Sequence, residues 1–331
     1  MSFAISIDDI EAAASRLKDV AVVTPLLESP YLNEIAGRRV LVKAEVLQRT
    51  GSFKFRGAWN AVTALQEREP GCGVIAYSSG NHAQGIAQAA ALHGVAAVII
   101  MPNDAPELKL ANTRALGAEV ILYDRPGGES RESIGDSLAE QRGLHLVRPY
   151  DDPYVMAGQG SCGLEIVEQA AKAGVDSGDV LVCCGGGGLS SGLALTLQAK
   201  APEMRVRPVE PVSSDDVCRS LIAGHRIANE TQSTSICDAI VTPMPGELSF
   251  PILDSLSGPG LSVSDEDALK AMVQAMLRLK LVVEPGGAVA LAAALAGQDL
   301  DGDAVCCVVS GGNADPAMLM KALEHFAYAD M

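Results

Sequence analysis

The sequence predicts an α/β protein with two doubly wound domains, each built on a parallel sheet. From residue 74 onward, short apolar runs of strand length alternate with longer runs of helix length. Strands that are apolar throughout, repeated in βα units, are typical of parallel sheets covered by helices on both faces. A chain of 331 residues with 48% hydrophobic residues is too long for one simple core, so we expect two domains.

The elements follow in a regular order. Ser6-Ile7-Asp8-Asp9 is typical of a helix start, and an apolar stripe continues that helix to Leu17. The next part of the chain predicts strands at 74–77, 96–101, 119–123 and 145–147, with helices at 80–93, 106–116 and 129–142 between them. Further strands are expected at 180–184, 206–209 and 304–309, and the Pro/Gly/Ser-rich segment 242–260 is expected to be an ordered surface excursion.

This order indicates how the domains are arranged along the chain. We expect a small inserted domain at 74–148 and a larger domain made of 1–73 and 149–331. Open α/β sheets bind ligands beyond the carboxyl ends of their strands. The loops that follow the predicted strands are therefore the places to look for a site.

Composition narrows the classes of partner. The chain has 25 basic and 41 acidic residues and a net charge of −16, which argues against nucleic acid and anionic membranes as partners. The eight cysteines form no C-x-x-C pair, and we interpret them as small buried hydrophobes in a reducing cytosol rather than as metal or disulfide residues. The N-terminus lacks the pattern of a secretory signal, and no segment has transmembrane length, so a cytoplasmic location is expected.

One lysine lies in an unusual setting. Lys54 is flanked by Phe53 and Phe55 within a run of small, turning residues. Apolar surroundings lower the pKa of a lysine, and the neutral amine is a nucleophile that forms Schiff bases. The alternative is an ordinary loop in which a lysine extends its charged end into water.

Four consecutive glycines form a second candidate site. Gly185, Gly186, Gly187 and Gly188 follow an apolar strand and precede a helix that begins near Leu189. Backbone N–H groups of such a loop converge on an anion, and the helix N-terminus adds a favourable potential. The loop matches neither the dinucleotide nor the P-loop pattern, so a monophosphate fits better. The alternative is a turn without a ligand.

Together these motifs resemble fold-type II pyridoxal-phosphate (PLP) enzymes of the serine/threonine dehydratase and serine racemase group, which share the tryptophan synthase β-like fold. The resemblance extends over nearly the whole chain and rests on motifs in the family's order at 51–57, 78–85, 157–160, 185–188, 284–287 and 310–313. It implies that Lys54 holds PLP as a Schiff base and that the glycine loop binds the cofactor phosphate.

The resemblance also assigns the remaining site residues. Asn81 would contact the 3-oxygen of the cofactor and Ser310 its pyridine nitrogen, with Phe53, Leu189 and Glu284 completing the cofactor surroundings. The loop Ser78-Ser79-Gly80-Asn81-His82 would receive the substrate carboxylate, although such residues are also good helix caps. Arg131 could add a contact to a carboxylate, or lie on a solvated helix face.

The reaction expected from this resemblance is β-elimination. Lys54 would remove the α-proton as a general base, the β-hydroxyl would leave, and a 2-oxo acid and ammonia would result. A neutral serine hydroxyl at the pyridine nitrogen suits rapid elimination, and the aromatic Tyr150 is commoner among dehydratase-like members. The expected substrates are L-threonine or L-serine, with 3-hydroxyaspartate as a further candidate.

Two other functions remain open. Serine racemase is the runner-up, with Ser79 as the acid–base group on the opposite face of the α-carbon. A non-catalytic PLP-binding protein is the remote alternative, although it would be expected to have lost Lys54 or a glycine loop. The family further implies a homodimer.

A metal site is the last expectation. Glu210, Ser214 through its carbonyl, and Asp216 are assigned to Mg²⁺ or Ca²⁺ by resemblance to metal-activated members. Two carboxylates and a carbonyl within seven residues suit hard cations that prefer oxygen. The alternative is an acidic surface turn without an ion.

Overall fold

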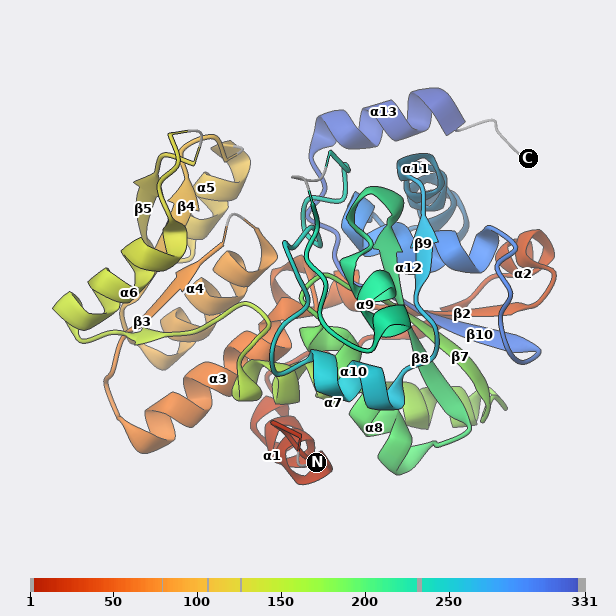
Figure 1. Ribbon diagram of the computed structural model, residues 1–331, viewed down its shortest axis with the longest axis horizontal. Coiled ribbons are helices and arrows are strands. Elements are labelled where there is room, and N and C mark those ends of the chain that lie inside the picture. Colours follow the sequence, from red (N-terminus) through yellow and green to blue (C-terminus); the bar gives the residue numbers. More distant parts are fainter. Residues whose placement is uncertain (1–2, 79, 106, 126, 231–233, 327–331) are drawn as a thin grey trace.

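Two β-sheets of different size organise the computed structural model, which describes residues 3–78, 80–105, 107–125, 127–230 and 234–326 (Figure 1). The strands are β1 (Leu26–Glu28), β2 (Arg39–Ala44), β3 (Val74–Tyr77), β4 (Ala97–Pro102), β5 (Glu119–Tyr123), β6 (His145–Leu146), β7 (Gly178–Cys183), β8 (Met204–Pro211), β9 (Leu261–Val263) and β10 (Ala304–Val309). The larger sheet has the order β1-β2-β10-β7-β8-β9, and the smaller has the order β5-β4-β3-β6. All neighbouring strands are parallel except β1 and β2, which confirms the predicted fold class.

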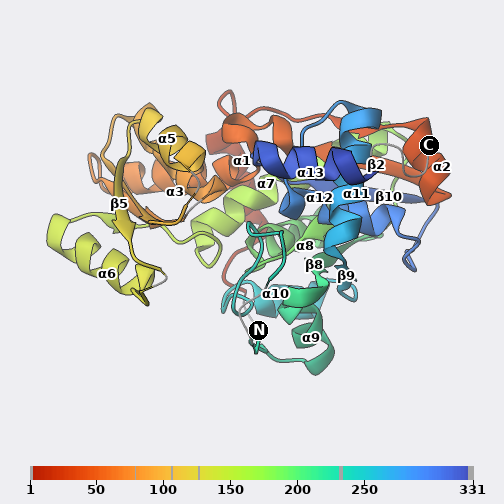
Figure 2. The ribbon, with the colours of Figure 1, turned by 90° about the horizontal axis from the view of Figure 1, so that it is seen from above.

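Helices cover both sheets. They are α1 (Ile7–Leu17), α2 (Pro30–Ala36), α3 (Lys54–Arg68), α4 (Asn81–His93), α5 (Glu107–Ala115), α6 (Arg131–Arg142), α7 (Pro153–Lys172), α8 (Gly188–Lys200), α9 (Asp216–Ala223), α10 (Phe250–Leu256), α11 (Asp265–Gln274), α12 (Pro285–Leu295) and α13 (Pro316–Phe326). Around the larger sheet, α1, α7 and α8 pack together as one group, and α11 and α12 pack together as another with α2 and α13 (Figure 2). Among the described residues, no helix has both the length and the apolar character needed to cross a membrane.

The smaller sheet shows why its strands are apolar on both faces. Side chains alternate between the faces of a strand. Val74 and Ala76 pack with α3 and α4, whereas Ile75 and Tyr77 pack with α6 on the opposite face. Strands β3 to β6 thus form a sheet of their own, but one of its two hydrophobic clusters also includes residues of α3 and Val155 of α7. The boundaries of a small domain at 74–148 stay a prediction.

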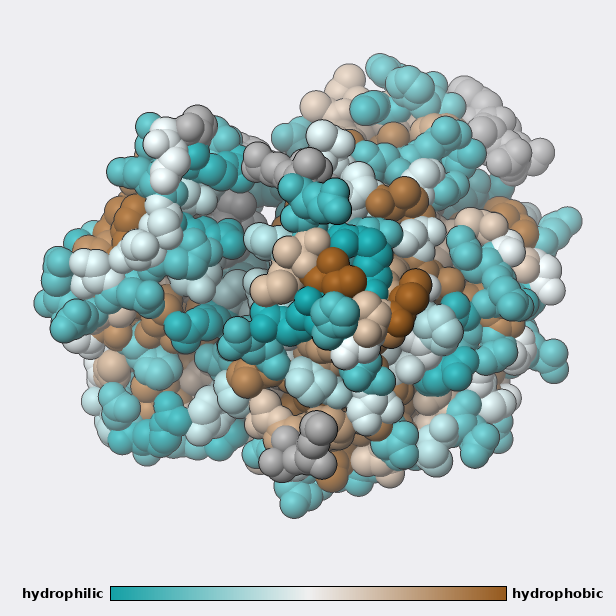
Figure 3. Space-filling model, viewed as in Figure 1, coloured by the Kyte–Doolittle hydropathy of each residue, from teal (hydrophilic) through white to brown (hydrophobic). Residues whose placement is uncertain are grey.

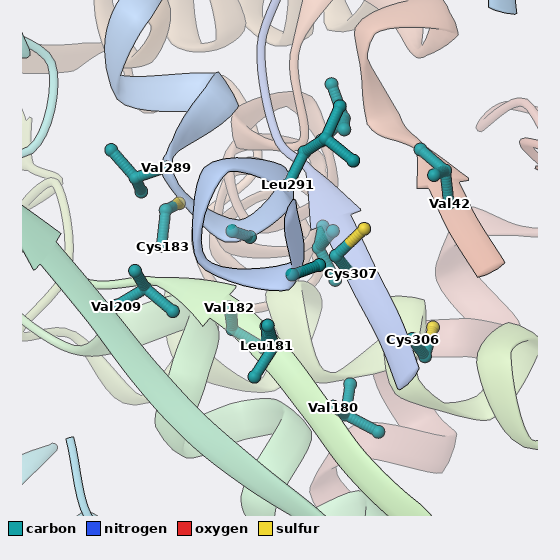
Figure 4. Close-up of a cluster of buried hydrophobic side chains, with 14 of the residues drawn as sticks. Val42, Val180, Leu181, Val182, Cys183, Val209, Val289, Leu291, Cys306 and Cys307 are labelled. Atoms are coloured by element: carbon teal, nitrogen blue, oxygen red, sulfur yellow. The ribbon is translucent and has the colours of Figure 1, made fainter. Parts of the chain in front are cut away.

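The core of the larger sheet is made of β-branched residues, leucines and cysteines. Val180, Leu181 and Val182 of β7 lie beside Cys306 and Cys307 of β10, and α12 covers them with Val289 and Leu291 (Figure 4). All eight cysteines are free, and seven of them are buried. The burial of these seven agrees with their interpretation as small buried hydrophobes.

The N-terminal helix forms as its sequence predicts. The Ser6 hydroxyl accepts from the backbone N–H of Asp9, and the Asp9 carboxylate accepts from the N–H of Ser6. This reciprocal cap satisfies two donors that a helix start leaves unpaired. The segment 242–260 differs from the prediction, because it contains α10 and several of its residues are buried, including Ser249, Ile252 and Leu253.

Candidate active site

A cavity lies where the carboxyl ends of strands from both sheets meet. It contains about 1030 Å³ of empty space, part of it open solvent, and receives the loops that follow β3, β7 and β10. The face seen in Figure 3 is hollowed between the part that holds β3–β5 and the part that holds the larger sheet. The residues that line the cavity include the predicted site residues Phe53, Lys54, Ser78, Gly80, Asn81, His82, Arg131, Gly185, Gly186, Gly187, Gly188, Leu189, Glu284 and Ser310. Residues as far apart as 53 and 310 are therefore brought together, whereas Ser79 lies outside the described residues.

Lys54 is the first residue of α3, and its amine points into this cavity. Nζ donates to the carbonyl of Pro149 at 2.8 Å and lies 5.1 Å from the centre of the Phe53 ring. Burial lowers the pKa of Lys54 to about 8, although Cys183 and Glu284 oppose that shift. A substantial fraction of the amine is thus neutral near physiological pH, as the flanking aromatic residues predicted.

The backbone around Lys54 is fixed to the loop that carries Ser310. The N–H of Phe53 donates to the Ser310 carbonyl at 3.0 Å, and Ser52 forms a β-bridge with Gly311. Two residues beyond Lys54, Arg56 is buried and binds both carboxylate oxygens of Glu45, at 2.8 Å each. Both contacts hold the start of α3 in one position relative to the larger sheet.

The glycine loop is enclosed by side chains that leave no room for a Cβ atom. A Cβ at Gly186 would collide with the Tyr150 ring, and one at Gly187 would lie 2.8 Å from the Ser249 hydroxyl oxygen. Gly187 also has a φ of +89°, which disfavours other residues. Because α8 starts at Gly188, the loop presents backbone N–H groups and a helix N-terminus to the same cavity.

The loop after β3 supplies polar groups from the opposite side. His82 is buried; its Nε2 lies 3.1 Å from the Val147 carbonyl, and its Nδ1 has no partner among the described residues. Burial, reinforced by Lys54, lowers the pKa of His82 to about 3, so the ring is neutral. Since Nε2 faces a carbonyl it carries the proton, and Nδ1 is left as a hydrogen-bond acceptor.

Asn81 belongs to a buried chain of hydrogen bonds. It donates through Nδ2 to Oε1 of Glu284 at 2.5 Å, and its Oδ1 accepts from Nδ2 of Asn313 at 2.7 Å. Burial raises the pKa of Glu284. A Cβ at Gly311 would collide with the Glu284 carboxylate, which explains the glycine at that position.

Ser310 lies at the end of β10 and is almost fully buried. Its hydroxyl oxygen accepts from the thiol of Cys183 at 3.1 Å. The sequence assigned no role to Cys183, although this residue ends the strand before the glycine loop.

Charged groups at the rim include residues that the sequence analysis missed. Arg131 lies 5.3 Å from the centre of the Tyr77 ring and binds Oε1 of Glu132 at 2.8 Å, with over a third of its side chain exposed. Lys109 binds Asp238 across the cavity at 3.1 Å. No local sequence pattern marks Lys109, Asp238 or Ser249, because their neighbours in the site are distant in the chain.

The predicted metal residues lie elsewhere: Glu210 is near the end of β8, Ser214 follows that strand, and Asp216 begins α9. The carboxylate of Glu210 accepts from the N–H groups of Val217 and Cys218 at 3.0 and 2.7 Å. Asp216 accepts from Asn229 through Oδ1, while its buried Oδ2 has no partner among the described residues. Burial raises the pKa of Glu210 to about 8 and that of Asp216 to about 6. Within the described ranges, no group of three or more histidine, cysteine and acidic residues is arranged to hold a metal ion.

Comparisons with known proteins agree with the resemblance. The family profile described as pyridoxal-phosphate dependent enzyme matches residues 17–311. The chain is 44% identical to an L-threo-3-hydroxyaspartate ammonia-lyase of Pseudomonas sp over 94% of this chain and 96% of that one, and 40% identical to a serine racemase of Schizosaccharomyces pombe over 93% and 94%. The solved structure of a threonine deaminase from T.th. is 45% identical and superimposes with a TM-score of 0.88, covering 94% of this chain and 99% of that one. The chain therefore belongs to the family of pyridoxal-phosphate-dependent enzymes, and to its fold type II.

Proposed function

We propose that this enzyme is an ammonia-lyase that converts a small β-hydroxy amino acid to a 2-oxo acid and ammonia. The observation that carries the proposal is that one cavity contains both the desolvated amine of Lys54 and the neutral hydroxyl of Ser310. L-threonine, L-serine and 3-hydroxyaspartate are the proposed substrates. Relatives with these activities support the proposal.

The residues present fit PLP. The glycine loop, which excludes any Cβ atom at Gly186, would hold the phosphate with its N–H groups and the start of α8. Asn81 would bind the 3-oxygen, Ser310 the pyridine nitrogen, and Lys54 the aldehyde carbon. Phe53, Leu189 and Glu284 line the same cavity and complete the cofactor surroundings. PLP supplies the electron sink that makes the α-proton of an amino acid removable.

Lys54 is proposed to be the base for that proton. Its amine is held by the Pro149 carbonyl and lacks a carboxylate partner among the described residues, so it is able to accept a proton once it is free. A neutral hydroxyl at Ser310 cannot keep a pyridine nitrogen protonated as a carboxylate would. This favours a reaction that disposes of the negative charge at once by losing the β-hydroxyl.

The substrate is proposed to bind at the loop after β3. Ser78 and the N-terminus of α4, whose cap is Gly80, would supply donors for the α-carboxylate. His82 lines the same cavity with a neutral ring. Arg131 at the rim is the proposed contact for the second carboxylate of 3-hydroxyaspartate.

The test is to incubate the purified protein with PLP and each candidate substrate, and to follow 2-oxo acid and D-amino acid together. We expect 2-oxo acid as the main product. If 3-hydroxyaspartate is preferred, Arg131→Met should raise its KM while leaving that of L-serine nearly unchanged. D-serine formed faster than pyruvate would overturn the lyase assignment.

Serine racemase activity is the second candidate. The 40% identity to a serine racemase supports it, and Ser79 is the residue proposed to act on the opposite face of the α-carbon. Ser79→Ala should then lose racemisation and keep part of the elimination. Equal loss of both reactions would instead indicate a role of Ser79 in carboxylate binding.

A Mg²⁺ or Ca²⁺ ion bound by Glu210, the Ser214 carbonyl and Asp216 is a further proposal. The unpartnered Oδ2 of Asp216, buried near a second carboxylate, supports it. Addition of either cation should raise the unfolding temperature of the wild type, and this effect should be absent in Asp216→Asn. An equal response of both proteins would place the cation elsewhere.

The assembly and location are proposals as well. We propose a homodimer in the cytoplasm, with a small domain at 74–148 inserted in a large domain of 1–73 and 149–331. The free cysteines suit a reducing compartment, and the separate sheet after residue 74 suits that division.

A further inference from the structure

Cys183 is the last residue of β7, and Ser310 directly follows β10, the neighbouring parallel strand. Val182 pairs with Val308, and the side chains of Cys183 and Ser310 both line the cavity. The thiol of Cys183 donates to the hydroxyl oxygen of Ser310 at 3.1 Å. Only 4% of each residue is exposed. Cys183 pairs with Val209 of β8, and both belong to the same buried hydrophobic cluster as Val289 of α12 (Figure 4).

The thiol keeps its proton at neutral pH. Burial raises the pKa of Cys183 to about 11 and outweighs the stabilisation that Ser310 and Lys54 would give a thiolate, so the protonated thiol is the form that contacts Ser310. A buried thiol is therefore available as a donor and is a poor nucleophile. Cys183 therefore affects the site by orienting the hydroxyl of Ser310 and not by acting as a nucleophile.

A serine hydroxyl has one proton to donate and two lone pairs to accept with. Because the thiol occupies one lone pair of Ser310, the hydroxyl proton is turned away from Cys183. In the described part of the chain, the Ser310 hydroxyl makes no hydrogen bond in which it donates that proton. The proton is thus available to a group within the cavity.

We propose that Cys183 is a positioning residue that fixes Ser310 as a hydrogen-bond donor toward the pyridine nitrogen of PLP. The inference rests on the proposed role of Ser310 and goes beyond it, because it gives the bond a direction. A nitrogen that accepts a hydrogen bond from Ser310 has no proton of its own. Cys183 thereby favours the neutral ring and, with it, elimination over reactions that need a longer-lived carbanion.

The test uses the protein loaded with PLP that carries ¹⁵N in its ring, with two readouts. The ¹⁵N chemical shift reports whether the ring nitrogen is protonated, and equilibrium dialysis gives the dissociation constant of PLP. Three variants separate donation from packing: Cys183→Ser keeps a donor, whereas Cys183→Val and Cys183→Ala remove it. Cys306→Val, in β10 and outside the cavity lining, is the matched control for loss of a buried thiol.

We expect the wild type and Cys183→Ser to show an unprotonated nitrogen. Cys183→Val and Cys183→Ala should shift the ¹⁵N signal toward the protonated position and weaken PLP binding by roughly fivefold, the effect of one lost hydrogen bond. Because Cys183 acts through Ser310, the same replacements should change neither readout in a Ser310→Ala background. A wild-type signal in Cys183→Val, or an equal change in the Ser310→Ala background, would overturn the proposal.

The wild type separates this proposal from the proposed function. If the wild-type nitrogen is protonated, the donor role of Ser310 is wrong and the inference is overturned, whatever the reaction. Formation of 2-oxo acid by the same sample then shows independently whether the lyase assignment stands.

Discussion

Two lysines, Lys43 in β2 and Lys54 at the start of α3, differ in what surrounds their amines. Lys43 is fully buried in β2, and its Nζ binds the Glu165 carboxylate at 2.6 Å, the Thr24 carbonyl at 2.6 Å and Gln169 at 3.0 Å. Lys54 is partly exposed to the cavity, and within the described ranges its Nζ has one hydrogen-bond partner, the Pro149 carbonyl. Among the described residues, the amine of Lys43 thus has three hydrogen-bond partners and that of Lys54 has one.

The neighbours of Lys43 extend its pairing into a network. Arg56 binds Glu165 at 2.7 Å as well as Glu45, and the Glu45 carboxylate also accepts from Thr24 at 2.5 Å. Burial opposes ionisation of Glu45, but Arg56 outweighs it and holds the pKa of Glu45 below its usual value. Two cations and two anions thus compensate one another and anchor α3 beside its reactive residue.

Burial alone does not make a lysine reactive. A buried amine that is paired with a carboxylate serves the structure, whereas a desolvated amine with only a carbonyl partner loses its proton more readily. Because Lys54 and Arg56 are two residues apart in one helix, the network around Arg56 also holds Lys54, the proposed catalytic residue, in place.

The largest expected effect is that of Lys54→Ala. Turnover should fall by more than about a thousandfold, because the variant lacks both the attachment point of PLP and the base. The visible absorbance of lysine-bound PLP should vanish while the circular dichroism spectrum of the fold is retained. Turnover close to that of the wild type would remove Lys54 from the mechanism.

Replacement of Lys43 should instead affect stability. Lys43→Met leaves the partly buried Glu165 without one of its two cations, which is expected to lower the free energy of unfolding by about 3 kcal/mol. Urea unfolding of the apoprotein measures this loss. Activity per folded molecule should stay within about threefold of the wild type, and a loss as large as that of Lys54→Ala would mean that the two lysines do not differ in role.

The pH dependence of cofactor capture tests whether the pKa of Lys54 is lowered. Since the pKa of Lys54 is lowered to about 8, roughly a tenth of its amines are neutral at pH 7 and about nine-tenths at pH 9. The rate at which apoprotein captures pyridoxal should therefore rise about tenfold over this range and then level off. Stopped-flow absorbance measures the rate, with Lys54→Ala as the blank; a rate still rising steeply above pH 10 would indicate an ordinary lysine.

The smallest effect is expected at a surface ion pair. Lys172 binds Glu168 at 2.6 Å, but both side chains are exposed. Lys172→Ala should leave the midpoint of urea unfolding nearly unchanged, because water and salt screen exposed pairs. If Lys172→Ala lowered the free energy of unfolding as much as Lys43→Met, the loss of stability would depend on ion pairing and not on burial.

Much of the fold was readable from local patterns. The strands at 74–77, 119–123 and 304–309 agree with the predicted bounds, since each is a mainly apolar run bounded by turn residues. Other elements shift by one or two residues at their ends, as β4 and α6 do. The segment 242–260 was predicted as a surface excursion, but Ser249 and its neighbours are buried because the glycine loop lies against them.

Local sequence patterns predicted only part of the site. Motifs with unusual local composition, such as the glycine loop and the flanked Lys54, indicated the cavity residues that they contain. Lys109, Asp238 and Cys183 carry no local signal, since each acquires its place from a partner at least 127 positions away in the sequence.

The sequence alone indicated the alternation of strands and helices after residue 74, the lysine that we propose as nucleophile and the glycine loop that we propose as the phosphate site. These depend on residue type and short spacing, which the chain carries before it folds. Only the tertiary structure decided that Lys54 lies beside Pro149 with a pKa near 8, that Tyr150 and Ser249 support the glycine loop, and that Cys183 meets Ser310. Desolvation and hydrogen-bond direction depend on which distant groups exclude water from a site, and folding alone brings those groups together.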